Sequence, residues 1–245
     1  MHLQFVGCGD AFGSGGRLNT CFHLVSKNVN ALIDCGASSL IGMNKFAINR
    51  NDIDVIFITH FHADHVGGLP FFLLEANYVT KRERPLIIAG PSGLKARYGG
   101  ILDAAFSGSP SIELKFPLLL RELEIGKLHD IGGVRVTPSH VVHDERAGPC
   151  LGFRFEIEGK TIAYSGDTEW TDALIGIGHD ADLFVCEAYT RDKPVQTHLS
   201  LSDLEKHLDQ IRPKRLILTH MSDDMLARRA ELPYETAEDG MIVKL

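Results

Sequence analysis

The chain of 245 residues is predicted to be an α/β protein, because segments with the pattern of strands and segments with the pattern of helices interleave from end to end. Short apolar, β-branched runs such as residues 55–58 and 151–157 recur between turn residues and indicate strands. Amphipathic stretches such as residues 67–78 and 92–106 have the period of helices. So many strands need more than one sheet, which predicts a sandwich of layers with helices on the outer faces.

Each further element follows from the same two patterns. Strands are expected at residues 3–6, 21–25, 29–33, 86–89, 134–137, 160–164, 183–186, 216–218 and 241–243. Helices are expected at residues 168–175, 200–210 and 223–229. No low-complexity tract, linker or short repeat divides the chain. Residues 1–245 are therefore expected to form one domain.

Composition narrows the class of protein and its surroundings. The formal net charge of −7 argues against nucleic acid as a long polyanionic partner, because such a partner would need a strong basic patch. The 5 cysteines form no close pair and leave one over, which indicates a reducing compartment. The first strand has no basic start or apolar leader before it, and no apolar run could span a bilayer. We expect a cytoplasmic protein with no membrane partner.

The strongest functional signal is the segment His60-Phe61-His62-Ala63-Asp64-His65, directly after the apolar strand around residue 56. Histidines two apart in a loop can turn both imidazoles toward one ion, and Asp64-His65 can serve an adjacent ion. One ion cannot easily use all four side chains. The cluster therefore predicts two divalent metal ions, with mixed nitrogen and oxygen ligation suited to Zn²⁺ and with Mn²⁺ or iron as alternatives.

This cluster resembles the signature of the metallo-β-lactamase superfamily, and weaker matches extend the resemblance over nearly the whole chain. They are the glycine loop 7–13, Leu32-Ile33-Asp34-Cys35-Gly36, Val141-Val142-His143, Tyr164-Ser165-Gly166-Asp167-Thr168 and Leu218-Thr219-His220. The resemblance implies a four-layer αββα sandwich, the metallo-β-lactamase fold. It assigns one metal ion to His60, His62 and His143, the other to Asp64, His65 and His220, and the bridging position to Asp167. Asp34 is expected to orient ligands without binding metal.

One ligand assignment is open, because His140 and His143 both follow the strand expected at residues 134–137. We favour His143, since it comes after Val141-Val142 in the extended approach that the superfamily shows. His140 is expected to hydrogen-bond a ligand or substrate, or to face solvent.

A site with two metal ions bridged by a carboxylate indicates a hydrolase. The two ions lower the pKa of a shared water, so that hydroxide is available near neutral pH, and they neutralise charge on an attacked phosphoryl or carbonyl oxygen. Phosphoesters, lactones, thioesters and β-lactams are all suitable substrates for such a site. Within the superfamily that the chain resembles, the true β-lactamases lack an aspartate bridge and are normally exported. Asp167 and the missing leader therefore argue against β-lactam hydrolysis.

Two further segments, Cys186-Glu187-Ala188-Tyr189 and Thr197-His198-Leu199-Ser200, resemble a pair of ribonuclease Z motifs. In that family an acidic group orients a histidine that meets the phosphate or protonates the leaving oxygen. The resemblance implies these roles for Glu187 and His198, with Asp64 as a third catalytic residue. The match is imperfect, since Cys186 replaces a histidine and His-Leu-Ser replaces His-Ser-Thr. As an alternative, His198 simply precedes a helix capped by Ser200 or Ser202.

The short run from His143 to Asp167 leaves no room for the arm with which long-form tRNA enzymes of that family grip tRNA. This argues against tRNA and favours a small phosphodiester, such as a cyclic nucleotide or an oligonucleotide end. We therefore predict a dinuclear phosphodiesterase of ribonuclease Z-like type that uses a metal-bridging hydroxide. The alternatives are a lactonase or thioesterase, which needs no help from His198, and a metal-binding protein without turnover. A homodimer is a family-level expectation.

Overall fold

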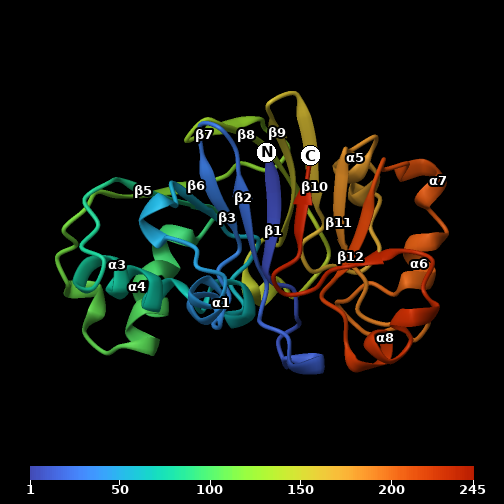
Figure 1. Cartoon of the computed structure of the whole chain (residues 1–245), viewed down its shortest axis with the longest axis horizontal. Helices are drawn as coiled ribbons and strands as arrows, with labels where there is room; N and C mark the ends of the chain where they lie inside the picture. Colours follow the sequence, from blue (N-terminus) through green and yellow to red (C-terminus); the bar gives the residue numbers. More distant parts are fainter.

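The computed structural model describes residues 1–245 and contains two mixed sheets of 7 strands each. Figure 1 shows the two sheets in the middle of the molecule, with helices on both outer sides. The predicted four-layer sandwich is therefore confirmed. The ends of the chain lie side by side, because the first strand pairs with the last.

The first sheet is built from the N-terminal half of the chain and the last strand. Its order is β14 (Ile242–Lys244), β1 (His2–Gly7), β2 (Cys21–Val25), β3 (Asn30–Ile33), β4 (Val55–Phe57), β5 (Leu86–Gly90) and β6 (Leu118–Glu122). Neighbouring strands are antiparallel from β14 to β3 and parallel from β3 to β6. The carboxyl ends of β3, β4 and β5 therefore meet at one edge.

The second sheet repeats this plan with the C-terminal half. Its order is β13 (Glu235–Thr236), β12 (Leu216–Thr219), β11 (Leu183–Glu187), β10 (Lys160–Tyr164), β9 (Leu151–Ile157), β8 (Val134–His140) and β7 (His129–Ile131). Strands β10 to β13 are parallel, and β7 to β10 are antiparallel. The parallel half again gathers carboxyl ends at one edge, where ligands commonly bind in α/β sheets.

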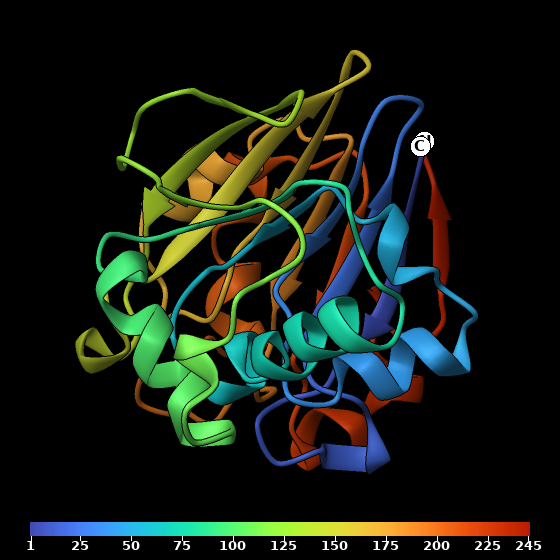
Figure 2. The same ribbon diagram turned by 90° about the vertical axis from the view of Figure 1, so that its left-hand side faces the viewer.

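The helices divide between the two outer faces. The first sheet packs through its outer apolar cluster against α1 (Ser39–Lys45), α3 (Leu69–Tyr78) and α4 (Leu94–Ala105), which Figure 2 shows from the outside. The second sheet packs against α5 (Ala173–Gly178), α6 (Leu201–Glu205), α7 (Leu208–Ile211) and α8 (Asp223–Ala227). The short α2 (Ala63–Val66) lies in the loop after β4. No helix is both long and apolar enough to cross a lipid bilayer.

The main core lies between the sheets. Alternate side chains of most strands point into it, as period-two geometry requires. Rings meet across the sheet interface: Phe57 of β4 lies 5.1 Å from Phe155 of β9, and Phe22 of β2 lies 5.0 Å from Tyr164 of β10, centroid to centroid. These contacts fix how the two sets of strand ends face each other, and thereby place the site.

Several element boundaries differ from the predicted ones. The helix expected at residues 168–175 begins at Ala173, because the preceding backbone is bound elsewhere: Thr168 N donates to Glu187 and Glu169 N donates to the Val142 carbonyl. The helix expected at residues 200–210 is interrupted at His207, whose φ of −124° is not helical. Strand β8 continues to His140, three residues beyond the expected end at residue 137. The sequence patterns also missed α1, β6, β7 and β13.

Candidate metal centre

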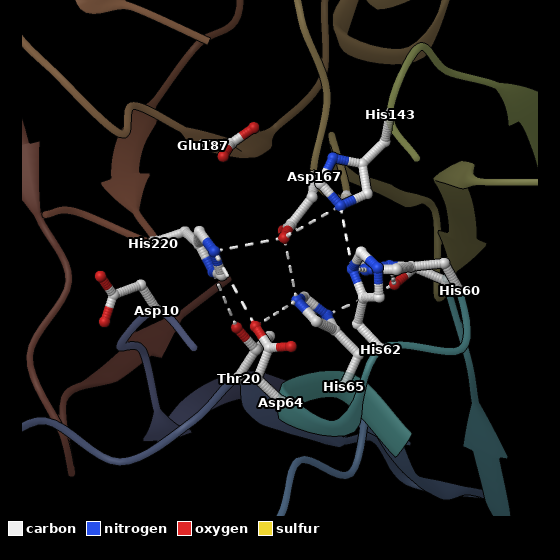
Figure 3. Close-up of polar contacts among 12 residues, drawn as sticks. Asp10, Thr20, His60, His62, Asp64, His65, His143, Asp167, Glu187 and His220 are labelled. Atoms are coloured by element: carbon white, nitrogen blue, oxygen red, sulfur yellow. Dashed lines mark hydrogen bonds and ion pairs between the residues drawn. The ribbon is translucent and has the colours of Figure 1, made fainter. Parts of the chain in front are cut away.

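Side chains from both sheets converge at the carboxyl ends of the strands, as Figure 3 shows. The loop after β4 and the start of α2 supply the cluster between His60 and His65. The loops after β8, β10 and β12 supply His143, Asp167 and His220. The structure thus brings together all seven residues that the sequence suggested as ligands, and they form two adjoining groups.

The first group consists of three histidines. His62 Nδ1 lies 3.1 Å from His60 Nε2 and 3.1 Å from His143 Nε2. Three ring nitrogens this close, each turned toward the same point, form a suitable triad for one cation of the Zn²⁺ type. His140, the other candidate, is the exposed last residue of β8 and belongs to neither group.

The second group mixes carboxylates and imidazoles and is buried. His65 Nε2 lies 3.3 Å from Asp64 Oδ2 and 3.2 Å from Asp167 Oδ2. His220 Nε2 lies 3.2 Å from the same Asp167 oxygen. This set of nitrogen and oxygen donors also suits zinc.

Asp167 stands between the two groups. Its Oδ2 lies 4.0 Å from His143 Nε2 of the first group as well as near the two histidines of the second. Its Oδ1 is buried and has no hydrogen-bond partner. An unpartnered buried carboxylate oxygen is costly unless a cation or donor satisfies it. The residues present therefore fit a pair of metal ions with Asp167 shared between them.

Most of these histidines are held through their other ring nitrogen. His65 Nδ1 donates to Asp34 at 2.7 Å, and Asp34 also accepts from the Thr59 backbone N–H at 2.8 Å. His143 Nδ1 donates to the carbonyl of Thr197 at 2.7 Å, and His62 Nε2 lies 3.5 Å from Asp144. Such contacts fix the tautomer and the ring orientation, which leaves the opposite nitrogen directed at the centre.

Burial and charge move the pKa values of the metal-free site apart. Burial lowers the pKa of His60 well below its usual value, and the neighbouring His65 adds to the effect. Burial also opposes a charge on His65, but the carboxylates of Asp167, Asp64 and Asp34 outweigh it and raise the pKa of His65 well above its usual value. The three carboxylates concentrate negative charge in a dry site, which favours cations.

Glu187 and His198 lie beside this centre. Glu187 ends β11, is fully buried, and accepts the Thr168 backbone N–H at 2.7 Å and a hydrogen bond from His198 Nδ1. The His198 ring stacks on Tyr189 at a centroid distance of 4.4 Å. Burial opposes charge on His198, but Glu187 outweighs it and raises the pKa of His198 to about 9. Ser200 caps α6, as the alternative interpretation of this segment expected, so both features coexist.

A cavity of about 720 Å³ opens over the site. Metal-centre residues and His198 form part of its lining, and Phe12, Arg146 and Tyr189 extend it outward. The volume lies in the range of pockets for small molecules, roughly 300–1,000 Å³.

Sequence patterns missed several residues that position the ligands. Thr20 lies 3.4 Å from His220 Nδ1, and Thr59 lies 3.0 Å from His60 Nδ1. Asp144 contacts His62, and Thr197 contacts His143 through its backbone. Thr20 and Thr197 lie far from their histidines in the chain, and Thr59 and Asp144 are adjacent to ligands but have no pattern that marks them as contacts.

Comparisons with known proteins agree with this geometry. The sequence profile of the family described as "Anti-Pycsar protein Apyc1" matches residues 1–241. A ribonuclease Z from Agathobacter rectalis is 27% identical over 271 residues, covering 89% of this chain and 86% of its own. An Anti-Pycsar protein Apyc1 from Bacillus phage 010DV004 is 27% identical over 244 residues, covering 92% and 90%. The crystal structure of the short form of human tRNase Z is 26% identical, with a TM-score of 0.79 over 100% of this chain and 99% of that one.

A diphosphatase of the PhnP family, at 21% identity and a TM-score of 0.80 over 100% of this chain and 97% of that one, shares the fold. The fold and the His/Asp cluster define a metallo-β-lactamase-fold hydrolase related to ribonuclease Z. Within that class, the chain belongs to the Apyc1 family.

Proposed function

We propose that this protein is a dinuclear metal-dependent phosphodiesterase acting on a small phosphodiester. The observation that carries the proposal is the pair Glu187 and His198 beside a carboxylate shared by two groups of donors. A thioesterase needs the metal site but expels a thiolate, which leaves without an acid of this kind. The related ribonuclease Z and tRNase Z proteins carry names that fit the same chemistry.

In this proposal His60, His62 and His143 would hold one ion, Asp64, His65 and His220 the other, and Asp167 both. Two such ions activate water as a nucleophile and neutralise charge on the phosphoryl oxygens. The protein's part is to keep the donor atoms in place. Asp34 does this for His65, and Thr197 does it for His143.

His198 would assist departure of the alcohol. Its Nδ1 is occupied by Glu187, so Nε2 is the nitrogen left for the cavity that His198 lines. The oxygen of a water attacks phosphorus while one proton of that water passes to solvent, and one P–O ester bond breaks with its electron pair staying on the leaving oxygen. That oxygen takes the proton from His198 Nε2, and Glu187 stabilises the imidazolium before the transfer. His198 regains a proton from solvent after the product has left.

The size of the substrate follows from the surroundings of the site. Residues 143–167 form a short 3₁₀ turn (Glu145–Ala147) and the hairpin of β9 and β10, with no protruding arm. A cavity of about 720 Å³ accepts one nucleotide-sized molecule more readily than a folded RNA. A cyclic nucleotide or the end of an oligonucleotide meets both conditions.

The test compares turnover of adenosine 3′,5′-cyclic monophosphate, whose cleavage expels a ribose alkoxide that must be protonated, with turnover of a panel of lactones and thioesters. His198→Ala should lower kcat for the phosphodiester by about 10²–10⁴-fold, the usual contribution of a general acid. His140→Ala, an exposed histidine outside both groups, is the matched control and should keep full activity. Fast lactone turnover that is insensitive to His198→Ala would overturn the proposal in favour of an acyl-ester hydrolase.

The dinuclear arrangement has its own test. Asp167→Ala removes the carboxylate shared by both groups, so bound metal should fall below two ions per chain and hydrolysis should be lost. Metal analysis of the purified protein, together with initial rates, measures both effects. Two ions per chain and a normal rate in Asp167→Ala would contradict the shared-ligand arrangement.

A further inference from the structure

The loop between β1 and β2 holds a phenylalanine in an unusual position. Phe12 exposes 84% of its surface, more than any other large apolar side chain in the protein. Together with Ala11 it lines the outer part of the cavity over the metal centre. An exposed ring contributes no hydrophobic stabilisation to the free protein. It contributes such stabilisation only when a bound molecule removes it from water.

The loop fixes this exposure. The carboxylate of the buried Asp10 accepts the backbone N–H of Phe12 at 3.2 Å, the backbone N–H of Ser14 at 2.9 Å and the Ser14 hydroxyl at 2.7 Å. Gly13, Gly15 and Gly16 follow with positive φ, and Gly15 N–H donates to Asp223 of α8 at 3.2 Å. The tight turn is therefore tied down on both sides of Phe12, and its ring is presented by a built loop.

The charges of the cavity decide what Phe12 can recognise. Arg146 is the single lysine or arginine in the lining, and its guanidinium is already paired with Asp144 at 2.9 Å, next to Glu145. A substrate with a second phosphate would find no free cation outside the metal centre. Beyond the metal centre the lining offers the uncharged Gln196 and the rings of Phe12 and Tyr189, which suit an uncharged, planar part of the substrate.

We propose that Phe12 is a specificity-determining residue, whose ring stacks on the planar base of a substrate that has its phosphate at the metal centre. The inference rests on the proposed phosphodiesterase function and assigns the contact for the base. Stacking of this kind tolerates different bases, because every base has a π-face.

The experiment compares two phosphodiesters that differ only in the base. These are adenosine 3′,5′-cyclic monophosphate and the base-free methyl ribofuranoside cyclic phosphate, each with wild type, Phe12→Ala, Phe12→Trp and the control Val79→Ala. Val79 is also exposed but does not line the cavity. Phe12→Ala should raise KM for the nucleotide by about tenfold, as expected for one lost stacking contact, with kcat nearly unchanged. Phe12→Ala should leave KM for the base-free substrate unchanged, and Val79→Ala should leave KM for both substrates unchanged. Phe12→Trp should have a KM for the nucleotide close to that of wild type.

A binding measurement separates this inference from the proposed function. Adenosine 5′-monophosphate contains no diester bond, so the enzyme cannot cleave it. Its addition should quench the fluorescence of the tryptophan introduced by Phe12→Trp and leave that of the tryptophan introduced by Val79→Trp unchanged. If wild type cleaves neither phosphodiester, the proposed function fails, and the quenching still decides whether a base stacks at position 12. Three results for Phe12→Ala would each overturn the assignment: an equal rise in KM for both substrates, no rise in KM for either, or a change of oligomeric mass without base discrimination.

Discussion

At the scale of single residues, Glu169 connects the metal centre to His198, the proposed general acid. Its carboxylate accepts the backbone N–H of Thr197 at 2.7 Å, and its own N–H donates to the Val142 carbonyl at 2.7 Å. Thr197 has a φ of +69°, a left-handed conformation that strains a β-branched residue. The strained residue in turn presents its carbonyl to His143 and directly precedes His198. One carboxylate thus holds the turn that orients both histidines.

We therefore expect Glu169→Ala to weaken metal binding by about 10–100-fold, the range found when outer contacts of ligands are removed. Glu169→Gln keeps an acceptor oxygen and should retain most of the affinity. Competition with a chelator at fixed pH measures the affinity. Glu156→Ala, which removes a half-buried carboxylate paired with Arg135 and far from the metal centre in the second sheet, is the matched control. Unchanged affinity in Glu169→Ala would show that Thr197 holds its conformation without this contact.

The parts of the site that could be predicted from the sequence are those with a local pattern. Four ligand-type side chains in six positions between His60 and His65 are visible without any structure. The role suggested for Asp34 depends on a strand end, and the structure adds its hydrogen bond to His65. Glu169 and Phe12 could not be predicted, because their roles depend on a backbone contact and on solvent exposure, which only the folded chain defines.

At the scale of elements, strands with an apolar pattern on both faces were predicted well. Strands β2, β9 and β10 have the predicted bounds. In β2 and β9 most inner and outer side chains are buried, and in β10 the last three residues are buried. Strand β6 was missed, since its edge position allows the exposed Arg121 and Glu122 to interrupt the pattern. The order of strands within each sheet depends on contacts between distant segments, and no single-sequence pattern encodes it.

Strand β2 also carries a histidine, His23, that makes the stability of the folded protein depend on pH. His23 exposes only 9% of its surface, and neither of its ring nitrogens has a hydrogen-bond partner. Burial lowers the pKa of His23 from 6.5 to about 4, with the charge of His2 adding to the effect and that of Asp52 opposing it. As the pH falls through about 6.5, His23 binds a proton in the unfolded chain but not yet in the folded chain. The folded state should therefore lose stability between about pH 6.5 and pH 4, by up to about 3 kcal/mol.

His23→Phe should remove this contribution while keeping an aromatic side chain in the strand. Urea unfolding of the metal-free protein between pH 4 and pH 8 measures the effect. The difference between wild type and variant is the relevant quantity, because the histidines of the metal centre titrate in both and cancel. At low pH the variant should gain stability relative to wild type. A difference that stays constant with pH would show that His23 finds a way to bind its proton in the folded state.

At the scale of the whole molecule, the two sheets share one core and one site. Phe57 of the first sheet packs on Phe155 of the second at 5.1 Å and lies 6.1 Å from Phe153. The metal centre takes residues up to His65 from one sheet and from His143 onward from the other. Pairing of β1 with β14 closes the chain on itself. Neither half can therefore bury its inner face or complete the metal centre alone.

We accordingly propose that residues 1–245 unfold as one cooperative unit, and a substitution in one half tests this from the other. Phe57→Ala should lower the free energy of unfolding by about 3–5 kcal/mol, as for other large cavities. The probe is Trp170, the single tryptophan, which stacks on His207 between the helices of the second sheet. Its fluorescence transition in urea should shift as far as the transition seen by circular dichroism. Leu119→Ala on the exposed face of β6 serves as the control, with little effect on either transition. If Trp170 kept its wild-type midpoint while circular dichroism split into two steps, the sheets would be independent folding units, and the shared core would not couple them.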